Sequence, residues 1–441
     1  MTYGYSHIFK ISLPLILGMM IQVLVGVTDT AFLGRVGEIE LGASAIAGIL
    51  YLLFYMIAQS FAVGAQIIMA RRNGEENYQK IAPVLYQVIS FVILFAIISI
   101  AFIYRFSGAV LSRTIESSVI LSAILTYLLP RCWGLFFSGG KSAFRAFFVA
   151  ITNTQALLPA AVVLLTANFI FDYWFIFGGF GIEPMGLHGA ALASVLAEAL
   201  SLGYLAGYTL LKVNLRQYGF FKYLFWCNSL FIEIFRLSVW IIFQNLLSWG
   251  IWLYFFIEVE KLGADALAIS NILRSASSLP FIFANALAMV TSSIVSNLIG
   301  AAKDREVLPT AFRILKFGFI PYYASFIIMA LFPEVFLRIY TDDAILIKQA
   351  VEPFYTMLLT YLLALPGMIY FYAIYGTGKT RTALIIEVLC SVAYIAAIRI
   401  IVGILRLELV WCWTSEISYY VILLAASYWY MKRKKWCCEI V

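Results

Sequence analysis

Residues 157–178 read LLPAAVVLLTANFIFDYWFIFG, and Asp172 is the only charged side chain in this run. An α-helix rises roughly 1.5 Å per residue, so a run of this length crosses the roughly 30 Å hydrocarbon core of a bilayer. Similar runs recur along the whole chain, which has 441 residues and is 63% hydrophobic and 12% charged. No ordinary soluble fold buries so much apolar surface. The sequence therefore predicts an all-α polytopic membrane protein.

We count roughly twelve runs that are long enough to cross a membrane. They cover residues 8–32, 44–70, 81–106, 118–138, 157–178, 187–212, 231–258, 269–298, 309–332, 346–373, 381–404 and 410–431. Basic residues concentrate in the loops that share a side with the N-terminus, as the positive-inside rule requires of cytoplasmic loops. The net charge of +7 is therefore a sign of topology, and no nucleic-acid partner is expected. We expect a multi-pass protein of the inner (plasma) membrane with both termini in the cytoplasm.

The two halves of the chain match each other at one constant offset, which pairs Gly37 with Gly263 and Gly74 with Gly300. An unbroken match across two helices and a loop supports internal duplication. Parallel repeats of six helices are typical of secondary transporters, whose sites lie between or within the two lobes. The predicted parts are an N-terminal lobe at 1–211, a cytoplasmic linker at 212–235 and a C-terminal lobe at 236–441.

The strongest candidate site combines Asp29 in the first apolar run with Asn168 and Asp172, one helical turn apart in the fifth. Charged groups are unfavourable inside a bilayer, so each is by default a hypothesis about an ion or substrate path. Two carboxylates that meet in a low dielectric compete, and such a pair can hold a proton, bind a small cation or attract a cationic substrate. Amide and carboxylate oxygens also suit an alkali cation such as Na⁺. The alternative is that each acid is satisfied by a neighbouring helix or lies near the headgroups.

Four further residues are accessory candidates. Pro14 interrupts the hydrogen bonds of the first helix and is either a hinge or a static kink. Tyr127 lies near the middle of the fourth run, where its hydroxyl is within reach of the acids, although packing is the commoner role for a tyrosine. Lys141 and Arg145 follow that run, and they either pair with an acid in the inward-facing state or anchor the cytoplasmic end.

The second half offers fewer candidates. Glu387 and Arg399 either take part in transport or neutralise each other, whereas Glu198 and Glu416 occupy comparable positions that favour a paired structural role. The chain has no nucleotide-binding motif, so an ion gradient is the expected source of energy. It also lacks a His/Glu metal motif and a Ser/His dyad, so no enzyme activity, resident metal or cofactor is expected apart from the coupling ion.

Several stretches together resemble the multidrug and toxic compound extrusion (MATE) family. They are Pro14, Val27–Thr30 with Arg35–Gly37, Gly64–Gly74, Asn168–Gly178 and Gly186–Ala193. Because the acids lie in the N-terminal half, the chain looks similar to the DinF-like branch. The resemblance implies twelve helices in two lobes that form a V and rock between inward- and outward-facing states. It also implies a site at Asp29, Asn168 and Asp172, with Tyr127 nearby and Pro14 as the bending point.

The chain departs from the family pattern at two places. The glutamate that another branch carries in the middle of its seventh helix is absent, since Leu247 and Ser248 stand there. Arg145 stands where the family pattern has a neutral polar side chain, and an ion pair at that position would alter coupling.

These observations predict a secondary active antiporter that exports organic cations and drugs in exchange for H⁺ or Na⁺ by alternating access. Its partners would be small cationic or amphipathic substrates and the lipid bilayer, and we expect it to act as a monomer. The alternative is a flippase for lipid-linked oligosaccharides from a related superfamily, which a basic, lipid-accessible central cavity would favour. A membrane-embedded enzyme and a channel are further classes, and uncoupled conductance would identify the channel.

Overall fold

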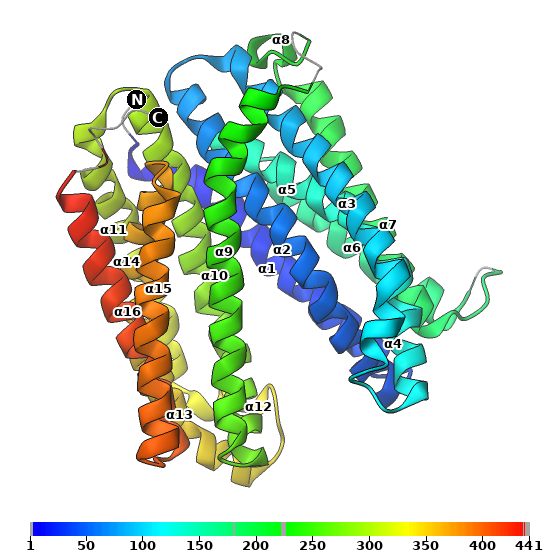
Figure 1. Cartoon of the computed structure of the whole chain (residues 1–441). Helices are drawn as coiled ribbons and strands as arrows, with labels where there is room; N and C mark the ends of the chain where they lie inside the picture. The colour runs from blue at the N-terminus through cyan, green and yellow to red at the C-terminus, as the bar shows by residue number, and fades with distance from the viewer. Residues whose placement is uncertain (1–2, 180, 222–225, 435, 437–441) are drawn as a thin grey trace. The chain divides into compact units, whose positions relative to one another are not determined.

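The computed structural model describes residues 3–179, 181–221, 226–434 and 436 (Figure 1). The only β pairing among these residues is an isolated bridge between Gly179 and Ile182. Eleven helical segments of the described chain are long and apolar enough to cross a membrane, and the bent pair α4–α5 makes twelve if it counts as one span. The prediction of an all-α polytopic membrane protein is confirmed.

The chain divides into two compact units, which we call the N-terminal unit (Leu13–Ser238) and the C-terminal unit (Met1–Ser12 with Val239–Val441). The N-terminal unit holds most of α1 (Tyr5–Leu33), α2 (Glu38–Gly74), α3 (Ile81–Leu111), α4 (Ser118–Arg131), α5 (Gly134–Ala150), α6 (Leu157–Phe177), α7 (Gly186–Lys212) and the short α8 (Leu215–Tyr218). The division passes through α1 between Ser12 and Leu13, next to Pro14, whose role as a hinge stays a prediction.

Most of α9 (Asn228–Glu260) belongs to the C-terminal unit, which continues with seven further helices and one π-helical turn. They are α10 (Ala264–Gly300), α11 (Val307–Leu331), α12 (Pro333–Arg338), α13 (Ala344–Tyr361), α14 (Ala364–Gly376), α15 (Thr380–Ile398), the π-helical turn Arg399–Ile404 and α16 (Leu409–Lys432). The helix starts repeat the offset between Gly37 and Gly263, because α10, α11 and α13 begin at that same interval after α2, α3 and α4. The duplication therefore extends from the sequence to the secondary structure.

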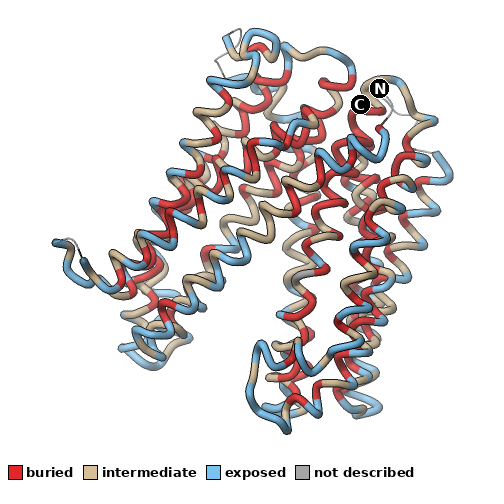
Figure 2. Tube along the Cα trace, turned by 180° about the vertical axis from the view of Figure 1, so that it is seen from behind, coloured by how far each residue is buried: buried red, intermediate tan, exposed pale blue. Residues whose placement is uncertain are grey.

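In each unit the buried residues lie on the faces that neighbouring helices turn toward one another (Figure 2). In the N-terminal unit, Ala47 on α2, Leu128 on α4 and Ala191 on α7 belong to one buried cluster. Small side chains let these helices approach closely, as is usual inside membranes. Large apolar side chains are instead exposed on outer faces, as at Ile97 and Ile98 on α3. Because soluble proteins avoid wide exposed apolar surfaces, these outer faces are suited to lipid.

The fourth span differs from the expected single helix at 118–138. The helical path continues to Ala150, and α4 and α5 meet at an angle of 48°. Pro130 lies at the end of α4 and cannot donate its backbone hydrogen bond, which weakens the helix next to the break. The break places Arg131 at the last position of α4 and Gly134 at the first position of α5.

The segment expected to link the two lobes, 212–235, is partly helical. Residues 222–225 lie outside the described chain, but α9 already begins at Asn228. Phe231 packs on Phe61 of α2 at a ring distance of 5.7 Å, and Glu233 pairs with Arg72 at 3.3 Å. These contacts within the N-terminal unit stabilise the first two turns of α9.

Candidate functional site

The structure brings the three predicted site residues together inside the N-terminal unit. Asn168 and Asp172 project from the same face of α6, and both are 0% exposed. The Asp29 carboxylate of α1 lies within interaction range of both of them. On its other side, the Ser194 hydroxyl of α7 donates to Asp29 Oδ2 at 3.4 Å. The helix α1 and the consecutive helices α6 and α7 thus build one polar cluster.

The atoms of this cluster are largely unsatisfied. Asp29 Oδ1, both carboxylate oxygens of Asp172 and both polar side-chain atoms of Asn168 are buried without a hydrogen-bond partner in the described chain. Leaving one such group unpaired costs about 1–3 kcal/mol, and more for a charged one, so native proteins rarely do so without a reason. The arrangement is suited to receive a proton or a small cation.

Tyr127 lies beside this cluster without bonding to it. It is buried on α4, within electrostatic range of Asp29 and Asp172. Its hydroxyl makes no hydrogen bond to either acid in the described part of the chain. Four residues further along α4 stands Arg131, so the two side chains share one helix face. Tyr127 is therefore within electrostatic range of both the acids and a second charged group.

That second group is a buried ion pair that the sequence reading missed. Arg131 Nη1 and Nη2 donate to the two carboxylate oxygens of Glu198 on α7, at 3.1 and 2.9 Å. The guanidinium also lies over the Tyr51 ring at 3.9 Å, and the Tyr51 hydroxyl donates to Glu198 at 3.3 Å. Glu198 thus bonds neighbouring helices, as expected. One sequence feature could have indicated the pair. Arg131 follows Tyr127 by four residues, and Glu198 follows Ser194 by the same four residues, so each charge lies one helical turn from a polar side chain near the acids.

Gly134, at the start of α5, leaves room for this ion pair. A Cβ atom added there would overlap Arg131 Nη1 and lie 2.7 Å from Glu198 Oε2. We therefore expect Gly134→Ala to lower stability by about 1–3 kcal/mol, the usual cost of overpacking a core. Thermal unfolding in detergent checks this. Gly203→Ala is the matched control, because no atom lies within 4 Å of its added Cβ, and unfolding of both variants at the wild-type temperature would contradict the explanation.

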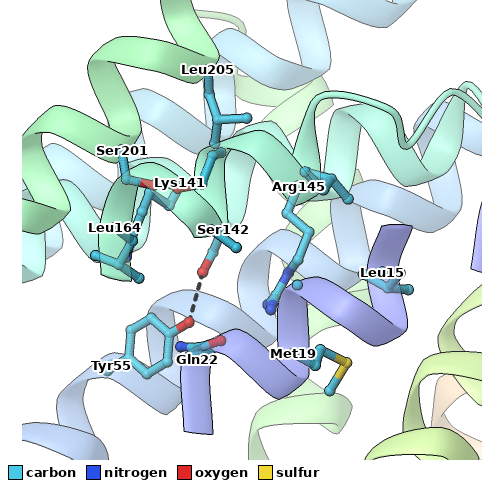
Figure 3. A pocket seen from close by; sticks show the side chains of 14 residues that line it. Leu15, Met19, Gln22, Tyr55, Lys141, Ser142, Arg145, Leu164, Ser201 and Leu205 are labelled. Carbon is cyan, nitrogen blue, oxygen red and sulfur yellow. Dashed lines mark hydrogen bonds between the residues drawn. The ribbon is translucent and has the colours of Figure 1, made fainter. Parts of the chain in front are cut away.

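The two accessory basic residues line a separate cavity of about 80 Å³ (Figure 3). Lys141 Nζ lies 4.0 Å from Glu198 Oε1, at the outer limit of an ion pair. Arg145 has no carboxylate partner in the described chain, so the ion pair considered for it is not formed here. Tyr55 and Ser142 share a hydrogen bond of 3.2 Å across the same cavity.

In the C-terminal unit, Glu387 of α15 is 0% exposed and satisfied by hydroxyl groups. Tyr419 donates to both of its carboxylate oxygens at 2.9 Å, and Ser248 donates to Oε1. Ser248 in turn accepts from Gln244 at 3.0 Å. The alternative that Glu387 and Arg399 neutralise each other is wrong for this structure. Twelve residues along one helix separate them by about 18 Å.

A larger cavity of about 380 Å³ also lies in the C-terminal unit, next to Glu387. Its walls are mostly aromatic, and Arg274 lies over the ring of Trp252. Glu416 adds a second carboxylate to the lining. The Arg274 guanidinium therefore already occupies an aromatic face of this cavity.

Residues 14–174 and 241–400 match the family model described as MatE. The chain is 25% identical to the probable multidrug resistance protein NorM of Thermotoga maritima over 402 residues, which cover 86% of this chain and 82% of that protein. It is 23% identical to the protein of the same description from Synechocystis sp. over 338 residues, or 76% of this chain and 72% of that protein.

Solved structures share the fold. An outward-facing multidrug resistance MATE transporter of the MOP superfamily superposes with a TM-score of 0.90 at 15% identity, covering 98% of this chain and 95% of that one. A MOP superfamily transporter from Pyrococcus furiosus superposes with a TM-score of 0.88 at 16% identity, covering 98% of this chain and 95% of that one. The description of the second protein says that the reversed polarity of its binding pocket suggests a different function.

Proposed function

The chain belongs to the MatE family, and on this premise we propose that it is a secondary antiporter that exports organic cations and drugs in exchange for H⁺ or Na⁺. The observation that carries the proposal is the group of buried, unpaired oxygens on Asp29, Asn168 and Asp172. The names of the relatives support multidrug efflux as the direction and class of transport.

The proposed cycle uses competition at this cluster. With both acids ionised, the site attracts cationic cargo from the cytoplasm. Binding of H⁺ or Na⁺ from outside neutralises the acids and releases the cargo. Because linkage is reciprocal, ion and cargo must weaken each other's binding by the same factor. Carboxylate and amide oxygens suit Na⁺ and the carboxylates alone suit H⁺, so the cluster supports either ion.

We place the protein in the inner membrane with both termini in the cytoplasm, because basic residues collect in the loops on that side. We propose that it works as a monomer and belongs to the DinF-like branch, since its unpaired acids lie in the N-terminal unit.

The coupling ion is testable in proteoliposomes. A ΔpH and a Na⁺ gradient are imposed separately. We expect one of them to drive uptake of ethidium against its own gradient, and we expect no such uptake when both are absent. The ion that drives uptake is the one that the acids bind. Ethidium flux that follows only its own gradient, with neither ion coupled to it, would contradict antiport.

One observation favours a second function, a flippase for lipid-linked oligosaccharides. The cavity lined by Lys141 and Arg145 is basic, as expected for a site that holds a lipid phosphate. The two functions are separated by their cargo. Translocation of a fluorescent phospholipid analogue without ethidium transport would favour the flippase.

A further inference from the structure

The cavity at Lys141 and Arg145 has more positive than negative charge. The two side chains are four residues apart on α5 and line the same small space, where like charges repel (Figure 3). Lys141 reaches only one carboxylate in the described chain, that of Glu198, and does so at 4.0 Å. Both oxygens of that carboxylate already accept hydrogen bonds from Arg131. Arg145 has no carboxylate partner among the described residues.

The other groups around these two cations do not change this balance. Besides Arg145, Lys141 faces the phenol of Tyr55 on α2, the guanidinium of Arg131 on α4 and the carboxylate of Glu198 on α7. The lining from α6 is apolar, with Leu157 and Leu164 among its residues. A low dielectric strengthens the repulsion between unbalanced charges. A negative charge in this cavity would therefore reduce the repulsion.

Neutral hydrogen-bonding groups also line the space. Gln22 of α1 contributes an amide, and Ser142 of α5 contributes a hydroxyl. Figure 3 shows Arg145 reaching from α5 toward α1, where Gln22 lies. A planar guanidinium with an ammonium is a recurrent arrangement for phosphate and carboxylate groups. A volume of about 80 Å³ exceeds the roughly 10–15 Å³ needed for one water and leaves room for one such group.

We infer that this cavity binds a single oxyanion, a phosphate or a carboxylate group, between Lys141 and Arg145. The site goes beyond the proposed cation exchange, which uses Asp29 and Asp172. The bound oxyanion is either a free anion or part of the headgroup of an acidic lipid.

The oxyanion and the acids are linked through charge. Gln22 precedes Asp29 by seven residues of α1, so the cavity and the acids are about 10 Å apart along the helix. Two ionised carboxylates at that distance oppose an anion, and neutralising them removes the opposition. Protonation of Asp29 and Asp172 therefore strengthens anion binding, so that anion and proton bind together while cation and proton compete.

The test measures thermal unfolding of the purified protein in detergent while inorganic phosphate replaces chloride at constant ionic strength. A ligand that binds the folded state raises its unfolding temperature in a saturable way. We expect this rise in the wild type and its loss in Lys141→Gln/Arg145→Gln. The control is Lys212→Gln/Arg216→Gln, which removes two exposed charges at the same spacing and should keep the rise. Arg145→Gln alone should reduce the rise in unfolding temperature, and this single variant replaces the double variant if the double variant fails to fold.

Two more arms complete the experiment. Asp29→Asn/Asp172→Asn should lower the phosphate concentration at half-saturation by about tenfold, and an unchanged midpoint would overturn the linkage. In nanodiscs of phosphatidylglycerol, loss of the phosphate effect identifies a lipid headgroup as the occupant, whereas its persistence identifies a soluble anion. A phosphate effect that is absent from the wild type, or equal in all variants, overturns the site. Ethidium transport is measured separately, so the cation exchange can fail without affecting this result.

Discussion

Asp29→Asn and Asp172→Asn are each expected to abolish gradient-driven export of a fluorescent cation. The substitution keeps the shape of the side chain but removes the charge that attracts cargo and binds H⁺ or Na⁺. At an effective dielectric constant of about 20, one charge at 4 Å contributes roughly 4 kcal/mol, so cation affinity should fall by more than roughly 100-fold. Transport of ethidium into everted membrane vesicles measures the effect.

The matched control is Glu387→Gln. Glu387 is as deeply buried as Asp172, but its oxygens already accept hydrogen bonds from Ser248 and Tyr419. We expect this variant to retain export, because the unpaired acids lie in the other unit. All three variants should reach the membrane at wild-type levels, which immunoblotting checks. Full export by both aspartate variants would refute the site, and loss of export only in Glu387→Gln would move coupling to the C-terminal unit.

Glu198→Gln is expected to cause the largest loss of stability of any single change considered. It leaves the Arg131 guanidinium buried in the N-terminal unit without its bidentate carboxylate. Removing one partner of a buried ion pair typically costs about 3–5 kcal/mol, because the remaining charge is uncompensated. The unfolding temperature in detergent should drop well below that of the wild type.

The double variant Arg131→Met/Glu198→Leu tests the cause. Replacing both charges with apolar side chains of similar volume is often neutral or stabilising, so we expect most of the lost stability to return. If the double variant is no more stable than Glu198→Gln alone, packing around Arg131, and not its charge, sets the stability. If the double variant is folded and still exports cargo along the ion gradient, the ion pair stabilises the N-terminal unit without binding cargo itself.

The apolar pattern of the sequence was enough to predict the fold class and the repeat. A membrane span requires only a sufficient number of consecutive hydrophobic residues, so it can be predicted from the local sequence alone. The offset between Gly37 and Gly263 reappears in the starts of α2 and α10. The pattern was less informative about boundaries. It predicted the fourth span as one helix, whereas Pro130 and the break before Gly134 divide it into two.

The candidate site was predicted in part. Charged residues are rare in apolar runs, so Asp29 and Asp172 could be predicted from this feature, and Asn168 from its position one helical turn before Asp172. Arg131 also lies inside a predicted apolar run, 118–138, but its role was not predicted, because a lone basic residue does not indicate which acid it pairs with. Its partner Glu198 is distant in sequence and lies on another helix, and no local pattern indicates such a contact.

The sequence by itself thus determined that the chain crosses the membrane repeatedly, that its halves are repeats and that certain acids lie within the spans. Only the tertiary structure decided which polar groups meet. It left the oxygens of Asp172 unpaired, surrounded Glu387 with hydroxyls and placed Lys141 and Arg145 in one cavity. The physical reason is that burial of an apolar run depends on the run alone. Satisfaction of a buried charge depends instead on partners that other helices bring within about 3 Å.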